Sequence, residues 1–164
     1  MSNKAISLVL GSGGARGLAH VGVIRWLEEH GHQIRSISGC SIGSFIGGAY
    51  ATGTLDAIVD WMENLTKKEI YSMLDLSFSR DSLVKGEKLA EAIQSKIGTG
   101  LIEDLPIKFT AVAADIATEK EHWFQTGPID QAIRASVSLP LLFTPHTVDG
   151  VQLIDGGILT PTPI

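Results

Sequence analysis

The chain has 164 residues, of which 44% are hydrophobic and 19% charged, a balance that excludes intrinsic disorder and allows one domain with a substantial core. Its formal net charge of −5 argues against nucleic acid as a partner, because phosphate binding needs a clustered basic surface. Cys40 is the only cysteine, so an intramolecular disulfide is excluded and nothing indicates an oxidising compartment.

The N-terminal part alternates between strand and helix patterns. The chain enters its first strand pattern, residues 5–10, with no room for a signal peptide, which predicts a cytoplasmic protein. A helix pattern at residues 18–29 and a second strand at 34–38 follow, and then a Gly/Ala-rich helix. Residues 36–55 carry no charge, but a sharp turn within them predicts a buried helix rather than a membrane span. This order is typical of an α/β fold.

The second half contains two helix patterns, residues 55–65 and 86–97, separated by a polar and aromatic stretch at 71–85. That stretch predicts a surface excursion over the site, with apolar residues that either form an acyl-binding lid or pack on the core. The remaining patterns are strands at residues 109–115, 121–124 and 151–154 and a helix at 129–136. We therefore expect a single domain over residues 1–164.

The pentapeptide Gly39-Cys40-Ser41-Ile42-Gly43 lies between a predicted strand and a predicted helix. A strand that reverses sharply into a helix holds its turn residue in strained geometry, and flanking glycines allow neighbouring chain to pass closely. Ser41 would then lie at a helix N-terminus, where backbone N–H groups favour developing negative charge. The motif indicates a nucleophilic serine, against the alternative of a helix-capping serine.

Two further motifs accompany the pentapeptide. The first is the glycine-rich loop at residues 11–17, which contains Gly13, Gly14 and Arg16 and directly follows the first strand. A dinucleotide site is the alternative for this loop, but the glycine spacing is one residue too long and no acid ends the second strand. The second motif is Asp155-Gly156-Gly157, which alone would be an ordinary turn.

Together the three motifs resemble the patatin-like phospholipase family, in particular its small bacterial members. The resemblance covers nearly the whole chain, in the order of the family. It implies a three-layer α/β fold with a mostly parallel central sheet flanked by helices. It also implies that Ser41 is the nucleophile and Asp155 its only partner. The Gly13 and Gly14 amides would form the oxyanion hole, and Arg16 would either hold the loop or contact substrate.

The resemblance further implies a serine acyl hydrolase that cleaves fatty-acyl esters of lipids through an acyl-enzyme, without a metal or organic cofactor. Partners would be the lipid substrate and, transiently, a membrane surface. A lipid-binding or regulatory protein with negligible turnover is the alternative. Family domains continue with more helix and strand after the aspartate motif, so the chain is expected to be either a truncated core or an unusually short member.

A Ser-Asp-His triad is a second arrangement compatible with the sequence. Ser41, Asp115 and His146 occur in the chain order of α/β-hydrolases, although that fold normally places its nucleophile after more strands. The dyad instead predicts that none of the five histidines is essential, and their spacing matches no metal site. Cys40 is predicted to be a small buried residue beside the nucleophile.

Overall fold

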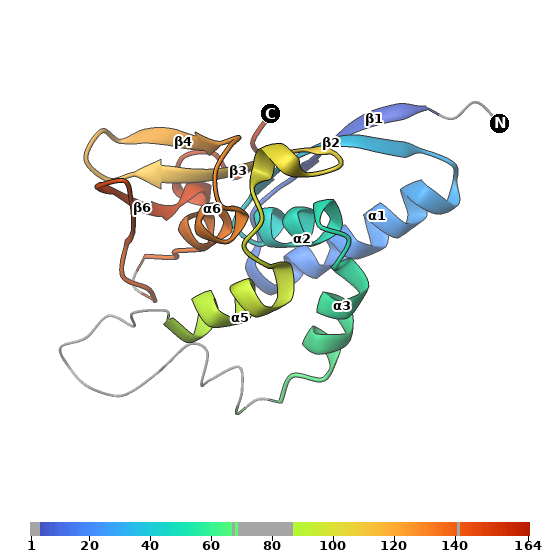
Figure 1. Cartoon of the computed structure of the whole chain (residues 1–164), viewed down its shortest axis with the longest axis horizontal. Coiled ribbons are helices and arrows are strands. Elements are labelled where there is room, and N and C mark those ends of the chain that lie inside the picture. Colours follow the sequence, from blue (N-terminus) through green and yellow to red (C-terminus); the bar gives the residue numbers. More distant parts are fainter. Residues whose placement is uncertain (1–3, 67, 69–86, 141) are drawn as a thin grey trace.

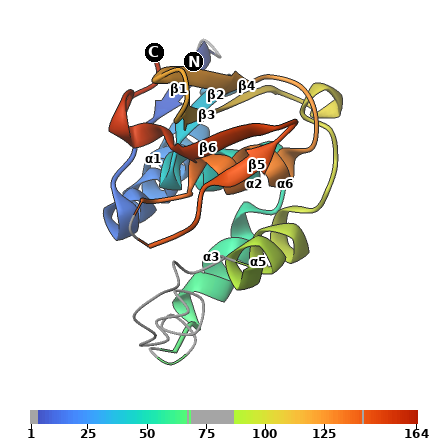
Figure 2. The same cartoon turned by 90° about the vertical axis from the view of Figure 1, so that its left-hand side faces the viewer.

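The structure, a computed structural model, describes residues 4–66, 68, 87–140 and 142–164. The predicted excursion at residues 71–85 lies outside the described residues. A six-stranded sheet forms the centre, and helices pack against it (Figures 1 and 2). The predicted fold class, α/β with a central sheet flanked by helices, is confirmed, and the sheet is mixed, with parallel and antiparallel pairings.

Three neighbouring strands of the sheet are parallel to one another, and the other three strands pair antiparallel with their neighbours. The parallel strands are β1 (Ala5–Leu10), β2 (Gln33–Cys40) and β3 (Lys108–Asp115). The antiparallel strands are β4 (Lys120–Phe124) and β6 (Val151–Asp155), which both pair with β3, and β5 (His146–Val148), which pairs with β6. The strands predicted from sequence therefore lie within two residues of their observed bounds.

The strand β3 brings the ends of β2 and β6 together. Both β4 and β6 pair with Ala113 and Asp115 of β3, so they occupy opposite edges of that strand. Since β2 and β4 also both pair with Val112, β6 shares the edge of β2 and continues where β2 stops. Cys40, the last residue of β2, therefore pairs with Val112. Asp155, the last residue of β6, pairs with Ala113, the residue that follows Val112 in β3.

The order of the parallel strands determines on which face of the sheet the connecting helices lie. Right-handed crossovers from β1 to β2 and from β2 to β3 place the connecting helices on the same face of the sheet. These helices are α1 (Ala19–Glu29), α2 (Ile42–Ala51), α3 (Leu55–Glu63) and α5 (Glu87–Ile97), and α6 (Ile129–Ser136) follows β4. Figure 2 shows α3 and α5 farther from the sheet than α2 and α6.

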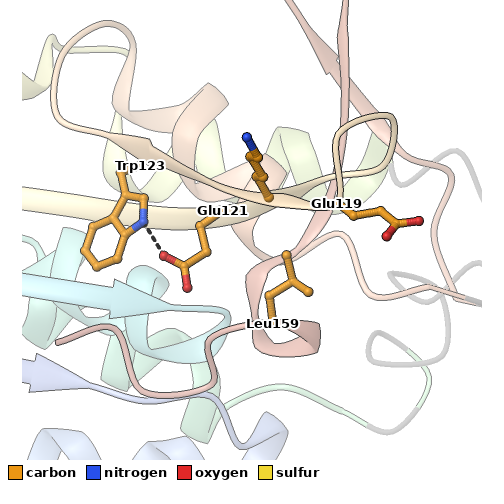
Figure 3. A pocket seen from close by; sticks show the side chains of 5 residues that line it. Glu119, Glu121, Trp123 and Leu159 are labelled. Atoms are coloured by element: carbon orange, nitrogen blue, oxygen red, sulfur yellow. Dashed lines mark hydrogen bonds between the residues drawn. The ribbon is translucent and has the colours of Figure 1, made fainter.

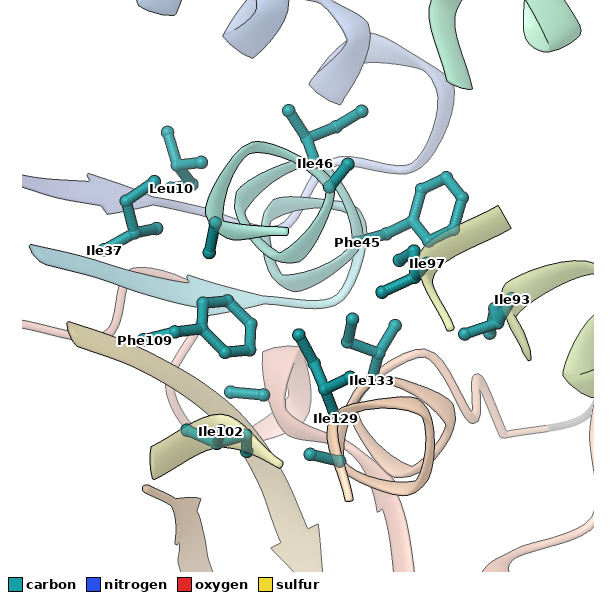
Figure 4. Close-up of a cluster of buried hydrophobic side chains, with 14 of the residues drawn as sticks. Leu10, Ile37, Phe45, Ile46, Ile93, Ile97, Ile102, Phe109, Ile129 and Ile133 are labelled. Carbon is teal, nitrogen blue, oxygen red and sulfur yellow. The ribbon is translucent and has the colours of Figure 1, made fainter. Parts of the chain in front are cut away.

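The helix α2 is almost entirely buried, as the sequence predicted for this uncharged segment: eight of its ten residues are buried. Its glycines allow close packing, because a Cβ at Gly47 would lie 2.7 Å from the Ile37 side chain and one at Gly48 would lie 2.5 Å from Ile133. Ile37, Phe109 and Ile133 surround this helix in the core (Figure 4). None of the described helices is both long enough and apolar enough to cross a membrane.

The strand β5, which forms a hairpin with β6, is not among the strands that the sequence patterns predict. Asp149 and Gly150 join the two strands, with φ angles of 49° and 82°. Positive φ at both central residues is the geometry of a type I′ turn, for which Asp-Gly is a favoured pair. The Asp-Gly pair was thus a signal in the sequence for the strand before it.

Candidate active site

Ser41 occupies the sharp turn between β2 and α2. Its backbone has φ 56° and ψ −126°, a strained conformation for a residue other than glycine. The flanking glycines are required by close contacts: a Cβ at Gly39 would lie 2.5 Å from the Gly43 carbonyl oxygen, and one at Gly43 only 2.0 Å from the Leu10 carbonyl oxygen. Ser41 therefore stands at the N-terminus of α2, in the strand-turn-helix context that the motif predicted.

Asp155 lies directly beside this serine. The Ser41 hydroxyl donates a hydrogen bond to Asp155 Oδ2 at 2.5 Å, and the Gly157 N–H donates to Oδ1 at 2.8 Å. Asp155 is only 2% exposed. Burial raises the pKa of its carboxyl group, against the opposing effect of the hydrogen bonds from Ser41 and Gly157. A carboxylate with a raised pKa is a stronger base for a serine proton.

The glycine-rich loop lies open beside the pair. Gly14 has φ +55°, and a Cβ there would meet no atom within 4 Å among the residues that the structure describes. Neither the Gly13 nor the Gly14 amide donates to a turn, loop or side-chain acceptor of the described chain. The His20 ring Nε2 hydrogen-bonds the Gly11 carbonyl oxygen at 2.9 Å, and Ser12 N–H donates to the Pro161 carbonyl at 2.8 Å. The loop is thus held at its start and has free donors at its tip.

The three motifs contact one another. A Cβ at Gly17 would lie 2.1 Å from the Ile42 side chain, so the glycine-rich loop packs on the residue that follows Ser41. The Ser12 hydroxyl donates to Cys40 Sγ at 3.2 Å and would lie 2.5 Å from a Cβ at Gly157. Segments more than a hundred residues apart in the chain therefore meet around one serine hydroxyl.

Arg16 and Cys40 lie at the edge of this arrangement. The Arg16 side chain is exposed, and its Nε lies 3.5 Å from the Gly13 carbonyl oxygen, at the limit of hydrogen bonding. Cys40 is fully buried, as predicted. Burial raises the pKa of its thiol to about 11, so the thiol stays protonated at neutral pH and is a poor nucleophile.

The residues of the alternative triad are engaged elsewhere. His146 Nε2 hydrogen-bonds Gln131 Oε1 at 2.7 Å, and Asp115 accepts hydrogen bonds from Ala117 and Thr118 in its own turn. The Ser41 hydroxyl donates to Asp155 instead. The geometry therefore brings together the serine and aspartate of the dyad and leaves the triad histidine with another partner.

Sequence reasoning missed Ser136, at the end of α6. Its hydroxyl accepts a hydrogen bond from the Ser41 N–H at 2.9 Å and donates to the Val112 carbonyl oxygen at 2.6 Å. The sequence around this residue does not reveal its contact with Ser41, because the contact spans 95 residues of sequence and depends on how α6 packs on β3.

A shallow pocket of about 490 Å³ lies along β4, and its lining includes neither Ser41 nor Asp155 (Figure 3). Its lining includes Glu121 and Trp123, whose indole N–H donates to Glu121 Oε2 at 2.6 Å. Glu121 is paired with Ala114, whereas Asp155 is paired with Ala113, so the two carboxylates point to opposite faces of the sheet. The pocket is therefore separate from the Ser41 site.

The comparison with known proteins agrees with the three motifs. The sequence model of the patatin-like phospholipases matches residues 8–164. The chain belongs to the patatin-like phospholipase family. This patatin-like chain is 47% identical over 163 residues to an uncharacterised NTE family protein of Mycobacterium tuberculosis and 38% identical over 168 residues to lysophospholipase NTE1 of Candida albicans.

The matched region is only a part of these relatives. It covers 99% of this patatin-like chain but 45% of the mycobacterial protein, and 100% of the chain but 12% of the yeast protein. Among solved structures, the crystal structure of VipD from Legionella pneumophila matches with a TM-score of 0.56 at 18% identity, over 100% of this chain and 47% of VipD. This structural match supports the fold.

Proposed function

We propose that the chain is a lipid acyl hydrolase that cleaves fatty-acyl esters through an acyl-enzyme on Ser41, with Asp155 as its base. The observation that carries the proposal is the 2.5 Å hydrogen bond from the Ser41 hydroxyl to a buried carboxylate with a raised pKa. The family and the lysophospholipase name of a relative support an ester of a lipid as the substrate.

In the first half of the reaction, Ser41 Oγ attacks the ester carbonyl carbon and its proton passes to Asp155 Oδ2. The carbonyl oxygen becomes an oxyanion, for which the free amides of Gly13 and Gly14 are the proposed donors. The N-terminus of α2 adds favourable dipoles at the same position. The tetrahedral intermediate then collapses, and the leaving alcohol takes the proton from Asp155.

In the second half, water attacks the acyl-enzyme. Asp155 accepts the proton from this water, and the intermediate collapses to release the fatty acid and restore Ser41. The exposed apolar side chain of Ile158, 55% exposed, follows the aspartate motif directly. It supports an apolar substrate and transient contact with a membrane surface, which we propose as the source of the lipid.

Hydrolysis of p-nitrophenyl acyl esters and of a lysophospholipid tests the proposal. We expect turnover by the wild type and a loss of about 10³-fold or more in Ser41→Ala, because the nucleophile is removed. Ser95→Ala is the matched control, since this exposed serine on α5 hydrogen-bonds the carbonyl oxygen of Ala92 in its own helix. Equal hydrolysis by the wild type and Ser41→Ala contradicts the proposal, and a wild type that binds lipid without turnover identifies a binding protein.

A further inference from the structure

The end of α6 contacts both members of the proposed dyad. The Ser136 hydroxyl accepts the Ser41 N–H at 2.9 Å, and two residues later the Ser138 carbonyl accepts the Asp155 N–H at 2.9 Å. We infer that this turn, residues 134–138, positions the nucleophile and the base relative to each other, with Ser136 as the positioning residue for Ser41. The inference rests on the proposed function.

Ser136 connects the strained turn of Ser41 to the central strand. The side chain is fully buried, and it donates to the Val112 carbonyl while it accepts from Ser41. A hydroxyl group can do both at once, which an alanine or an aliphatic side chain cannot. Because Ser41 has a positive φ, its backbone needs such surrounding contacts to stay in place.

Hydrogen bonds within the same turn hold it together. Arg134 is 3% exposed, and its Nη1 donates to the Ser138 hydroxyl at 2.6 Å. That hydroxyl donates in turn to the Arg134 carbonyl at 2.8 Å, and the guanidinium lies 5.5 Å from the centre of the Phe143 ring. A buried arginine that hydrogen-bonds within the turn fixes the direction of the Ser138 carbonyl, and thereby the position of Asp155.

Because the turn at residues 134–138 contacts both Ser41 and Asp155, we expect its disruption to have a specific kinetic effect. Ser41 and Asp155 lie 114 residues apart in sequence, yet their oxygens approach to 2.5 Å. A displacement of about 1 Å in such a pair lowers the chemical step by roughly 10²-fold. Ser136 is buried, and its hydroxyl is hydrogen-bonded to the backbone groups of Ser41 and Val112. Removal of this hydroxyl should therefore change kcat and leave KM nearly unchanged.

The test compares Ser136→Ala with Thr52→Val, which removes a hydroxyl at the opposite end of α2. The readouts are kcat, KM and the second-order rate at which a fluorophosphonate labels Ser41, each per folded molecule. In Ser136→Ala we expect kcat and the labelling rate to fall together by about 10- to 100-fold, with KM within about twofold. Thr52→Val should keep both rates, and Ser136→Thr, which retains a hydroxyl, should recover part of the loss.

Wild-type kcat and labelling rate in folded Ser136→Ala would overturn the inference and leave the proposed function standing. If Ser136→Ala gives no folded protein, Ser136→Cys decides, because its thiol donates and accepts only weakly. Wild-type rates in that variant also overturn the inference. If the wild type shows no turnover but its Ser41 still reacts with the fluorophosphonate, the proposed function fails while the labelling rates still test the positioning.

Discussion

The two glycine-containing motifs around Ser41 differ in what surrounds their glycines. At the turn, Gly39 and Gly43 leave no space for a Cβ, because backbone carbonyl oxygens lie within 2.0 to 2.5 Å of the position it would take. At the tip of the glycine-rich loop, Gly14 has a positive φ and open space around it. We call these the crowded and the open glycines.

The difference indicates two separate reasons for glycine near one serine. The crowded glycines allow β1, β2 and α2 to approach closely enough to form the turn, so they serve the fold. No atom of the described residues fills the space beside Gly14, and its amide has no acceptor in a turn, loop or side chain of that part of the protein. An unfilled position with a free donor is what a substrate oxyanion requires.

Gly43→Ala is expected to have the largest effect, namely loss of the folded protein. Its Cβ would meet the backbone of Leu10 in β1 at 2.0 Å, which no rotamer change relieves, so the cost should reach or exceed the ~3 kcal/mol of severe overpacking. Thermal melting followed by circular dichroism measures it. Gly22→Ala is the control, because this exposed helical glycine has no atom near its Cβ position and alanine should stabilise α1 by about 0.5–1 kcal/mol. A Gly43→Ala variant as stable as the wild type contradicts this account of the turn.

Asp155→Asn is expected to lower turnover by about 10³-fold or more, because the amide cannot accept the serine proton. The same change should raise the melting temperature at neutral pH. Burial raises the folded-state pKa of Asp155, so protonation stabilises the fold at low pH and that stabilisation is lost as pH rises through the raised pKa. Asparagine has no charge to bury, so the variant should melt at a higher temperature than the wild type, and this difference should shrink as the pH falls through the raised pKa of Asp155.

Melting curves and ester hydrolysis, both measured as functions of pH, check the expected changes in stability and in turnover of Asp155→Asn. In the wild type, kcat/KM should fall as the pH is lowered through the raised pKa of Asp155, since the base must be ionised. Full activity of Asp155→Asn, or an unchanged difference in melting temperature at all pH values, argues against Asp155 as a buried base.

Gly14→Ala is expected to lower turnover by roughly 10²-fold while the protein stays folded. The added methyl meets no atom of residues 4–66, 68, 87–140 or 142–164, so its effect falls on the substrate and on the direction of the free amides. Gly53→Ala is the matched control, because Gly53 also has a positive φ, +74°, with open space around it, and lies at the far end of α2. Both variants should lose similar stability, and near-normal turnover in Gly14→Ala would place the oxyanion donors elsewhere.

The sequence predicted those parts of the site that depend on local geometry. The turn at Ser41 and the loop with Gly14 are visible as glycines between a strand and a helix, and the resemblance added Asp155. The contact of Ser136 with the Ser41 amide was not predictable, because it requires β3 to bring α6 beside the end of β2. The position of Asp155 likewise depends on β6 occupying the edge of β3 that β2 vacates.

His146→Ala is expected to have the smallest effect, with turnover within about twofold of the wild type. The imidazole hydrogen-bonds Gln131, and the serine hydroxyl has the aspartate as its partner. Burial lowers the pKa of His146, so the ring is neutral at physiological pH and its removal leaves no charge uncompensated. Fluorophosphonate labelling of Ser41 and ester hydrolysis measure the outcome. Loss of acyl-enzyme formation in His146→Ala, together with normal formation in Asp155→Asn, would replace the dyad with a triad and make both glycine motifs part of a different mechanism.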